Sequence, residues 1–267
     1  MIKIDVLTYA SNYDYDIYER FVGSLINTGY NGNIYIIIKN HDLINIQLLQ
    51  TKYKNVFCYI DTNIITTHLN NHRFFIMKDI INNFNFNDYL LITDFRDVLF
   101  QKNIETYNYD PMIDLYAFTE NKKIKEDLNF NTPWLKILEK KIKQNFYNDI
   151  SNNNIICCGT TIGKKDAIKF YLNMMCDYII KYKIKLNLDQ GIHNYIFYCN
   201  KLNNFKIKIV FDNILVNTVG FEIQNIDETV NILNKNNDIS YIVHQYDRFT
   251  IELKEKLSNK YGYNFVK

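Results

Sequence analysis

Residues 90–101 read Leu-Leu-Ile-Thr-Asp-Phe-Arg-Asp-Val-Leu-Phe-Gln. The apolar run at 89–93 predicts a buried strand, and Asp94, Arg96 and Asp97 follow it before a second apolar run begins. Charged groups are costly at a buried strand end unless they are paired or liganded. Mg²⁺ and Mn²⁺ prefer oxygen ligands, and Mg²⁺ sites often use only one or two carboxylates. The stretch therefore predicts either a metal site or an Asp–Arg ion pair without an ion.

Strand and helix patterns alternate along the chain up to this stretch. Strands are expected at residues 2–9, 34–38, 56–60 and 89–93, and helices at 15–28, 43–52 and 71–84. This alternation predicts the α/β class, with a Rossmann-like, mostly parallel sheet flanked by helices. Ligands of such sheets bind beyond the carboxyl ends of the strands, here at Tyr9 and Ala10 and at 93–97.

The second half of the chain has a less regular pattern. Strands are expected at residues 115–119, 155–162 and 241–244, and helices at 132–146, at 165–181 and after Asp189. We expect one domain over residues 1–267, with a nucleotide-binding half at 1–101 and a mixed acceptor- and sugar-binding half at 102–267.

Composition excludes several classes of protein. The hydrophobic fraction of 47% suits a globular protein, and a formal net charge of +2 without an arginine cluster gives no support for a nucleic-acid partner. No stretch reaches the ~20 apolar residues of a membrane span. The five cysteines form no CxxC pair, which favours reduced thiols in a cytoplasmic protein. The bias toward residues with A/T-rich codons suggests a large DNA virus or an A/T-rich microbe.

Four stretches, in this order, resemble the GT-A glycosyltransferases. They are TDFRDVLFQ (93–101), CCGTTIG (157–163), LDQGIHNY (188–195) and IVHQYDR (242–248). The first resembles the DxD region of nucleotide-diphospho-sugar transferases that read TD-x-RDV-x-FQ, and the set is similar to retaining glycogenin- and galactosyltransferase-like enzymes. The opening LTYASNYD, the Arg20-Phe21-Val22 stretch and the Arg73-Phe74 pair also fit, so the resemblance spans nearly the whole chain.

The resemblance implies a Mn²⁺ or Mg²⁺ cofactor. Asp97 aligns with the last, metal-binding carboxylate of the family pattern, and His244 with a late histidine that completes the metal shell. The two carboxylates stand three residues apart rather than two, so Asp94 contacts the metal through water, the ribose, or Arg96. A lone histidine is also a common structural group, and Asp247 with Arg248 would suit a local ion pair.

The resemblance also implies contacts to the donor sugar. Asp189 and Gln190 would orient the sugar as catalytic residues, although an Asp at a helix start is equally explained as a cap. Asn194 lies four residues after Gln190 on the same helical face and would join them. Gly159 and Thr160 would admit a sugar close to the backbone, or would simply form a turn in a loop that Gly163 closes.

Four further residues are expected near the nucleotide. Tyr9 and Ala10 end the first strand, where the base and ribose would lie. Arg73 would neutralise the diphosphate, or would be a solvated charge on a helix. Gly220 would belong to a small loop beside the diphosphate, or would meet a backbone requirement.

These inferences predict a metal-dependent hexosyltransferase. The donor would be a nucleotide sugar, with UDP-sugar the first candidate, the acceptor a glycan or glycoprotein, and the sugar would be transferred with retention. One alternative is a nucleotide-sugar or glycan binding protein without catalysis, and another is a different metal-dependent phosphate-transfer enzyme. The chain contains no G-x-G-x-x-G, which disfavours a dinucleotide enzyme.

Overall fold

The computed structural model describes residues 2–220 and 225–266. The chain divides into two compact units, each built from stretches that are distant in sequence. Unit 1 consists of Met1–Thr62, Leu91–Tyr109 and Asp212–Lys267, and unit 2 of Asn63–Leu90 and Asp110–Phe211.

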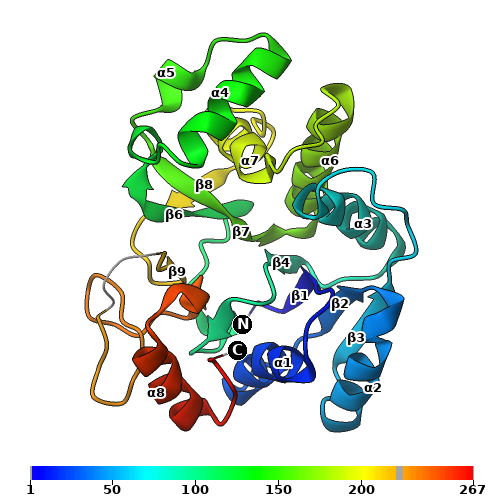
Figure 1. The fold of residues 1–267 in the computed structure, drawn as a ribbon, viewed down its shortest axis with the longest axis vertical. Coiled ribbons are helices and arrows are strands. Elements are labelled where there is room, and N and C mark those ends of the chain that lie inside the picture. Colours follow the sequence, from blue (N-terminus) through cyan, green and yellow to red (C-terminus); the bar gives the residue numbers. More distant parts are fainter. Residues whose placement is uncertain (1, 221–224, 267) are drawn as a thin grey trace. The chain divides into compact units, whose positions relative to one another are not determined.

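Unit 1 begins with strands and helices in alternation (Figure 1). They are β1 (Ile4–Tyr9), α1 (Tyr15–Asn27), β2 (Ile34–Ile38), α2 (Leu43–Lys52) and β3 (Val56–Ile60). The three strands pair in parallel in the order β3-β2-β1, and β4 (Tyr89–Thr93) lies next to β1. β1 and β4 are buried along their whole length, as continuous apolar runs predict.

A second, three-stranded sheet completes unit 1. Its strands are β5 (Val98–Phe100), β9 (Val216–Thr218) and β10 (Ile242–His244). β10 is central, antiparallel to β5 and parallel to β9. The helix α8 (Ile251–Tyr261) follows, and its Leu257 packs with Leu99, Val243 and Phe265 in a hydrophobic cluster. This cluster makes the C-terminal stretch part of the core of unit 1.

Unit 2 has mixed strand pairing and most of the remaining helices. Its strands β6 (Leu115–Lys123), β7 (Asn154–Lys164) and β8 (Ile207–Val210) lie in the order β7-β6-β8, with β6 antiparallel to β7 and parallel to β8. Its helices are α3 (Leu69–Asn83), α4 (Asn131–Ile142), α5 (Tyr147–Ile150), α6 (Lys165–Lys181) and α7 (Asp189–Tyr198).

The structure confirms the α/β class and most of the expected elements, with three differences. The helix expected over 132–146 ends earlier, because Lys143 takes a left-handed conformation with φ 56°. The loop expected at Gly159 and Thr160 is wrong, since both residues lie inside the buried strand β7. Strands β5, β8 and β9 and helix α8 were not expected; the strands are only three or four residues long and too short for a periodic signal.

The helices in the described part of the chain lack the length and apolar character needed to span a bilayer.

Candidate functional site

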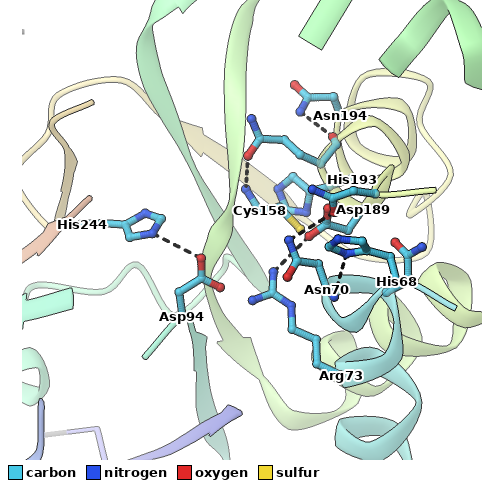
Figure 2. A network of polar contacts seen from close by, with 12 residues as sticks. His68, Asn70, Arg73, Asp94, Cys158, Asp189, His193, Asn194 and His244 are labelled. Atoms are coloured by element: carbon cyan, nitrogen blue, oxygen red, sulfur yellow. Dashed lines mark hydrogen bonds and ion pairs between the residues drawn. The ribbon is translucent and has the colours of Figure 1, made fainter. Parts of the chain in front are cut away.

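Three side chains that can bind a metal converge in unit 1. His244 Nε2 lies 3.4 Å from Asp94 Oδ2 and 3.7 Å from Asp97 Oδ2. One ligand atom from each of the three residues lies within 4.8 Å of the other two. Figure 2 shows the imidazole of His244 directed at the Asp94 carboxylate. The structure therefore brings together the three residues that the sequence predicted as metal ligands.

Strand pairing fixes this convergence. β10 pairs with β5 so that His244 stands opposite Val98, the residue immediately after Asp97. The backbone N–H of Gln245 then donates to the carbonyl of Asp97 at 2.8 Å, with Gln245 in the left-handed region at φ 67°. The histidine and the carboxylate are thus held by main-chain hydrogen bonds between segments that are far apart in sequence.

The two residues between Asp94 and Asp97 direct their side chains to different surroundings. Phe95 is buried, with its ring centroid 4.9 Å from that of Tyr18 and 4.5 Å from that of Phe21. Arg96 instead points outward, is 53% exposed and forms an ion pair with Asp247 at 2.5 Å. The loop of residues 94–97, hereafter the metal loop, is therefore anchored by one apolar side chain and one ion pair while Asp94 and Asp97 approach His244.

These contacts correct the ion pair expected between Asp247 and Arg248. Asp247 pairs with Arg96, whereas the guanidinium of Arg248 donates to Gln245 Oε1. The local Asp247–Arg248 pair expected from the sequence is therefore wrong. Asp247 links β10 and its following turn to the metal loop, while Arg248 braces the side chain of Gln245.

Burial and like charges make Asp97 unfavourable as an anion. Desolvation raises the pKa of its carboxyl, and the nearby negative charges of Asp94 and Asp247 raise it further. His244 and Arg96 oppose this shift without cancelling it. A divalent cation would offset the repulsion between the carboxylates, which fits a site made to hold one.

The donor set suits a divalent cation. Two carboxylate oxygens are ligands that Mg²⁺ and Mn²⁺ prefer, while an imidazole nitrogen is better matched to transition metals. Asp94, Asp97 and His244 together therefore offer the ligands of a candidate metal site.

Two of the four residues expected near the nucleotide, Tyr9 and Ala10, lie at the carboxyl end of β1, in unit 1. Ala10 is buried and its N–H donates to the carbonyl of Ile37. The Tyr9 hydroxyl donates to Asp61 Oδ2 at 2.9 Å, and Lys39 Nζ lies 2.9 Å from the same oxygen. Burial and the Asp61 charge raise the pKa of Tyr9 well above its ordinary value, so the phenol stays protonated. Asp61 and Lys39 were not singled out from the sequence.

Gly220 follows β9 and has a left-handed backbone with φ 54°. The preceding residue, Val219, donates its N–H to the carbonyl of His244. A side chain at position 220 would be strained whatever space it had, which supports the backbone interpretation of this glycine.

In unit 2, Arg73 and Asp189 form a largely buried ion pair. The guanidinium of Arg73, on α3, lies 3.1 Å from Asp189 Oδ2 at the start of α7, as Figure 2 shows. Arg73 is only 14% exposed, so a solvated charge is wrong for this residue. Asp189 is the first residue of α7 while Leu188 occupies the cap position, so the capping interpretation is also wrong. Its carboxylate still benefits from the dipole at the helix start.

Gln190, the next residue of α7, is held in one orientation by three hydrogen bonds. Its Nε2 donates to Glu120 Oε1 at 3.2 Å and to Asn131 Oδ1 at 3.0 Å. Its Oε1 accepts from the backbone N–H of Cys158 at 3.3 Å. An amide with both donors and its acceptor engaged cannot flip without breaking bonds, so the side chain is pre-oriented. Sequence reasoning missed Glu120 and Asn131, which give no local motif.

Three of the residues expected to contact the sugar, Gly159, Thr160 and Asn194, are buried in unit 2. Asn194 is completely buried, and its amide bonds both the N–H and the carbonyl of Ile156 and the carbonyl of Gln190. Thr160 is also completely buried, in the middle of β7 beside Gly159. Asn194 ties α7 to β7. A sugar-binding role for these residues stays a prediction, and their burial does not favour it.

Two solved structures with similar folds are both of the galactosyltransferase LgtC. One is LgtC in complex with donor and acceptor sugar analogs, with a TM-score of 0.57 and 10% identity over 91% of this chain and 87% of that chain. The other is an active-site mutant of LgtC in which a glutamine is replaced by glutamate, with a TM-score of 0.55 and 12% identity over the same shares. The chain has a GT-A fold. The likeness extends over nearly all of it, which confirms the fold expected from the four motifs.

No protein-family model matches the sequence. No curated protein matches it either. A 4-diphosphocytidyl-2C-methyl-D-erythritol synthase from Anaerococcus prevotii aligns with a TM-score of 0.49 and 13% identity, over 79% of this chain and 87% of that one.

Proposed function

We propose that this chain is a metal-dependent glycosyltransferase that moves a sugar from a nucleotide-sugar donor, UDP-sugar first among the candidates, to a glycan or glycoprotein acceptor. We further propose cytoplasmic action and transfer with retention, on the resemblance of the late histidine and the Asp189-Gln190 pair to those of retaining enzymes.

The observation that carries the proposal is the convergence of Asp94, Asp97 and His244 at the end of a buried strand of a GT-A fold. A divalent cation held there would neutralise the charge that develops on a departing diphosphate. The carboxylates are anchored through the backbone by strand pairing and through Phe95 and Arg96, so the ligands are pre-positioned rather than mobile.

Unit 1 also carries the residues proposed to bind the nucleotide. Tyr9 ends β1 and Ala10 follows it, and the buried Asp61 accepts from the Tyr9 phenol, whose raised pKa keeps it protonated. The carboxyl ends of parallel strands are the common ligand position in open α/β sheets. These observations support a base and ribose site at this edge.

Unit 2 carries the residues proposed to act on the donor sugar. Asp189 is fixed by Arg73, and Gln190 by Glu120, Asn131 and the Cys158 N–H. Polar side chains whose orientation is locked by their neighbours suit the recognition of sugar hydroxyls, because little entropy is lost on binding. LgtC also has a glutamine in its active site, which supports the role proposed for Gln190.

The test is a thermal-shift series with UDP-, GDP- and dTDP-sugars, each with and without Mn²⁺. A donor at ~100 times its Kd stabilises the folded state by about 2.7 kcal/mol, which is roughly 5–10 °C for a chain of this size. We expect the shift with one nucleotide family only, to require Mn²⁺, and to vanish in Asp97→Ala. The exposed Asp79→Asn on α3 is the control and should retain the shift.

Release of the nucleoside diphosphate then separates an enzyme from a binding protein. Donor turnover that needs Mn²⁺ supports the transferase, whereas tight binding without any turnover supports the non-catalytic alternative. If no nucleotide sugar stabilises the protein in the presence of Mn²⁺, the proposed function is wrong.

A further inference from the structure

The carbonyl of Arg96, in the middle of the metal loop, accepts hydrogen bonds from two buried side chains. The Tyr246 hydroxyl donates to it at 2.6 Å, and Arg20 Nη2 donates to it at 3.2 Å. Tyr246 is 1% exposed and Arg20 is 2% exposed. Two donors on one carbonyl fix the peptide that joins the two halves of the loop between Asp94 and Asp97.

Arg20 reaches this carbonyl from α1 through a mostly aromatic and main-chain environment. Its guanidinium lies 5.2 Å from the ring centroid of Tyr246 and 5.2 Å from that of Phe265. Its Nη1 donates to the carbonyl of Asn264. A buried guanidinium has a large desolvation cost, which these hydrogen bonds and cation–π contacts only partly offset. One side chain thus links α1, the metal loop and the C-terminal segment of unit 1.

The backbone of the metal loop decides where its two carboxylates point. Residues 95–97 form a bend and a turn between β4 and β5. Their side chains leave in different directions, since Phe95 enters the aromatic cluster and Arg96 points outward to Asp247. With Asp94 and Asp97 three residues apart, a rotation of the Arg96 peptide changes the separation of the two carboxylates. The donors that hold its carbonyl therefore act on metal geometry.

We propose that Arg20 and Tyr246 are positioning residues for the metal site, and that the segment at Asn264 and Phe265 supports them. The inference rests on the metal binding in the proposed function, and not on sugar transfer. Neither residue touches the cation. Each acts through the Arg96 carbonyl, so the loss of either weakens metal binding although all three ligands are still present.

A purely structural role makes a different prediction, and one matched pair of variants separates the two. Tyr246→Phe removes a buried hydroxyl that donates to the Arg96 carbonyl at 2.6 Å. Tyr30→Phe removes a buried hydroxyl that lies 2.6 Å from the Ile4 carbonyl and 3.0 Å from the Asn33 carbonyl, both outside the metal loop. Both variants delete one oxygen from a phenol of the same burial, so similar losses of thermal stability are expected.

The measurement is Mn²⁺ affinity, obtained from electron paramagnetic resonance of free Mn²⁺ and from calorimetry. We expect Tyr246→Phe to weaken Mn²⁺ binding by about tenfold, the lower end of the effect of residues that orient metal ligands, and Tyr30→Phe to leave it unchanged. Arg20→Met should weaken it at least as much, and Arg20→Lys should fall between Arg20→Met and the wild type because one ammonium cannot reach both carbonyls as the guanidinium fork does.

The inference is overturned if Tyr246→Phe and Arg20→Lys, both folded, bind Mn²⁺ like the wild type. It is overturned together with the proposed function if the wild type does not bind Mn²⁺. A wild type that binds Mn²⁺ but transfers no sugar contradicts the proposed function alone, and the affinity ranking of the variants still decides the inference.

Discussion

Asp97 shows a conflict between stability and binding at the scale of a single residue. Its carboxylate is only 15% exposed and lies beside the negative charges of Asp94 and Asp247. Because these surroundings raise its pKa, the folded protein without metal is destabilised by the charge at neutral pH. The sign follows from linkage: a carboxyl whose folded pKa is raised binds a proton more readily when folded, so this cost shrinks as the pH falls.

Asp97→Asn should therefore leave the metal-free protein as stable as the wild type or more so, while removing its response to Mn²⁺. The neutral amide keeps the shape and loses the repulsion. Melting temperatures at pH 7, with and without Mn²⁺, provide the measurement. Asp79→Asn, on the exposed face of α3, controls for the loss of a negative charge. A metal-free Asp97→Asn protein that melts several degrees below the wild type would contradict this account.

Glu120 matters because it supplies a charged acceptor to the Gln190 amide, whereas Asn131 and the Cys158 N–H are neutral. Hydrogen bonds to ionised acceptors are about 1 kcal/mol stronger than those between neutral groups. Replacing the carboxylate by an amide of the same shape keeps an acceptor but removes this extra strength, so Gln190 is held less firmly.

Glu120→Gln should accordingly lower kcat by roughly five- to tenfold, since about 1.4 kcal/mol corresponds to tenfold, and leave Mn²⁺ affinity unchanged. Steady-state kinetics and Mn²⁺ titration of the same samples test this. Glu126→Gln is the matched control, because Glu126 is an exposed carboxylate that accepts from the Lys123 N–H in the same segment. Equal kcat values for Glu120→Gln and Glu126→Gln would show that the charge of Glu120 is not needed to orient Gln190.

At the scale of elements, helix α7 carries both the residues proposed to orient the sugar and residues that are buried in the core. Asp189 and Gln190 begin the helix, and one turn later His193 is completely buried. His193 Nδ1 lies 2.8 Å from the Tyr171 hydroxyl, which is 3.9 Å from Cys158 Sγ. Burial, with a smaller contribution from the positive charge of Arg73, lowers the pKa of His193 to about 3. The imidazole is therefore neutral in the folded protein throughout the physiological range.

This neutral histidine should make the protein sensitive to mild acid. In the unfolded chain His193 takes up a proton near pH 6.5, whereas in the folded protein it does so only near pH 3. The unfolded state binds more protons between these values, so stability falls by up to about 1.4 kcal/mol per pH unit as the pH decreases below 6.5.

His193→Gln removes the pH-dependent loss of stability that comes from protonation of His193, and it keeps a polar partner for Tyr171. We expect the variant to lose less stability than the wild type between pH 7 and pH 5, although it is less stable at pH 7. Urea unfolding at several pH values gives the two slopes, and their difference isolates His193 from the other titrating groups. Identical slopes for wild type and His193→Gln would contradict a depressed pKa.

At the scale of the whole molecule, unit 1 is assembled from three separate stretches of chain. The last stretch contributes His244 to the candidate metal ligands, Tyr246 to the Arg96 carbonyl, and Leu257 and Phe265 to the hydrophobic cluster. β5, only three residues long, pairs with β10 from that stretch. The metal loop therefore depends on the C-terminal stretch for a ligand and for its packing.

A chain shortened to residues 1–211 should fail to bind Mn²⁺ and should expose the apolar surface of β5. The comparison is with His244→Ala in the 267-residue chain, which loses the candidate ligand but keeps β9, β10 and α8. We expect both proteins to lose Mn²⁺ binding, and the shortened chain alone to bind the hydrophobic dye ANS and to aggregate. Mn²⁺ binding by residues 1–211 with wild-type affinity would contradict this view of unit 1.

Local patterns predicted most strands and helices in their observed order, but not the short strands β5, β8 and β9 or the helix α8. Periodicity placed β2, α2, β3, β4 and α6 at their observed bounds, because burial on one or both faces leaves its mark on consecutive residues. The stretch from Asp94 to Asp97 stood out because charged groups at the end of an apolar run need a partner. The metal roles expected of Asp97 and His244 came from the resemblance to GT-A enzymes.

The contacts that hold these groups in place were decided only by the tertiary structure. Arg20 lies 76 residues from Arg96, and Tyr246 lies 150 residues from it, yet both donate to the same carbonyl. Glu120 lies 70 residues from Gln190. A buried arginine, tyrosine or glutamate has no periodic or motif signal of its own, because its partner is chosen by the crossing of distant elements. The sequence by itself determined most of the elements and the candidate ligands of this protein, and only the packing of the folded chain determined which side chains orient them.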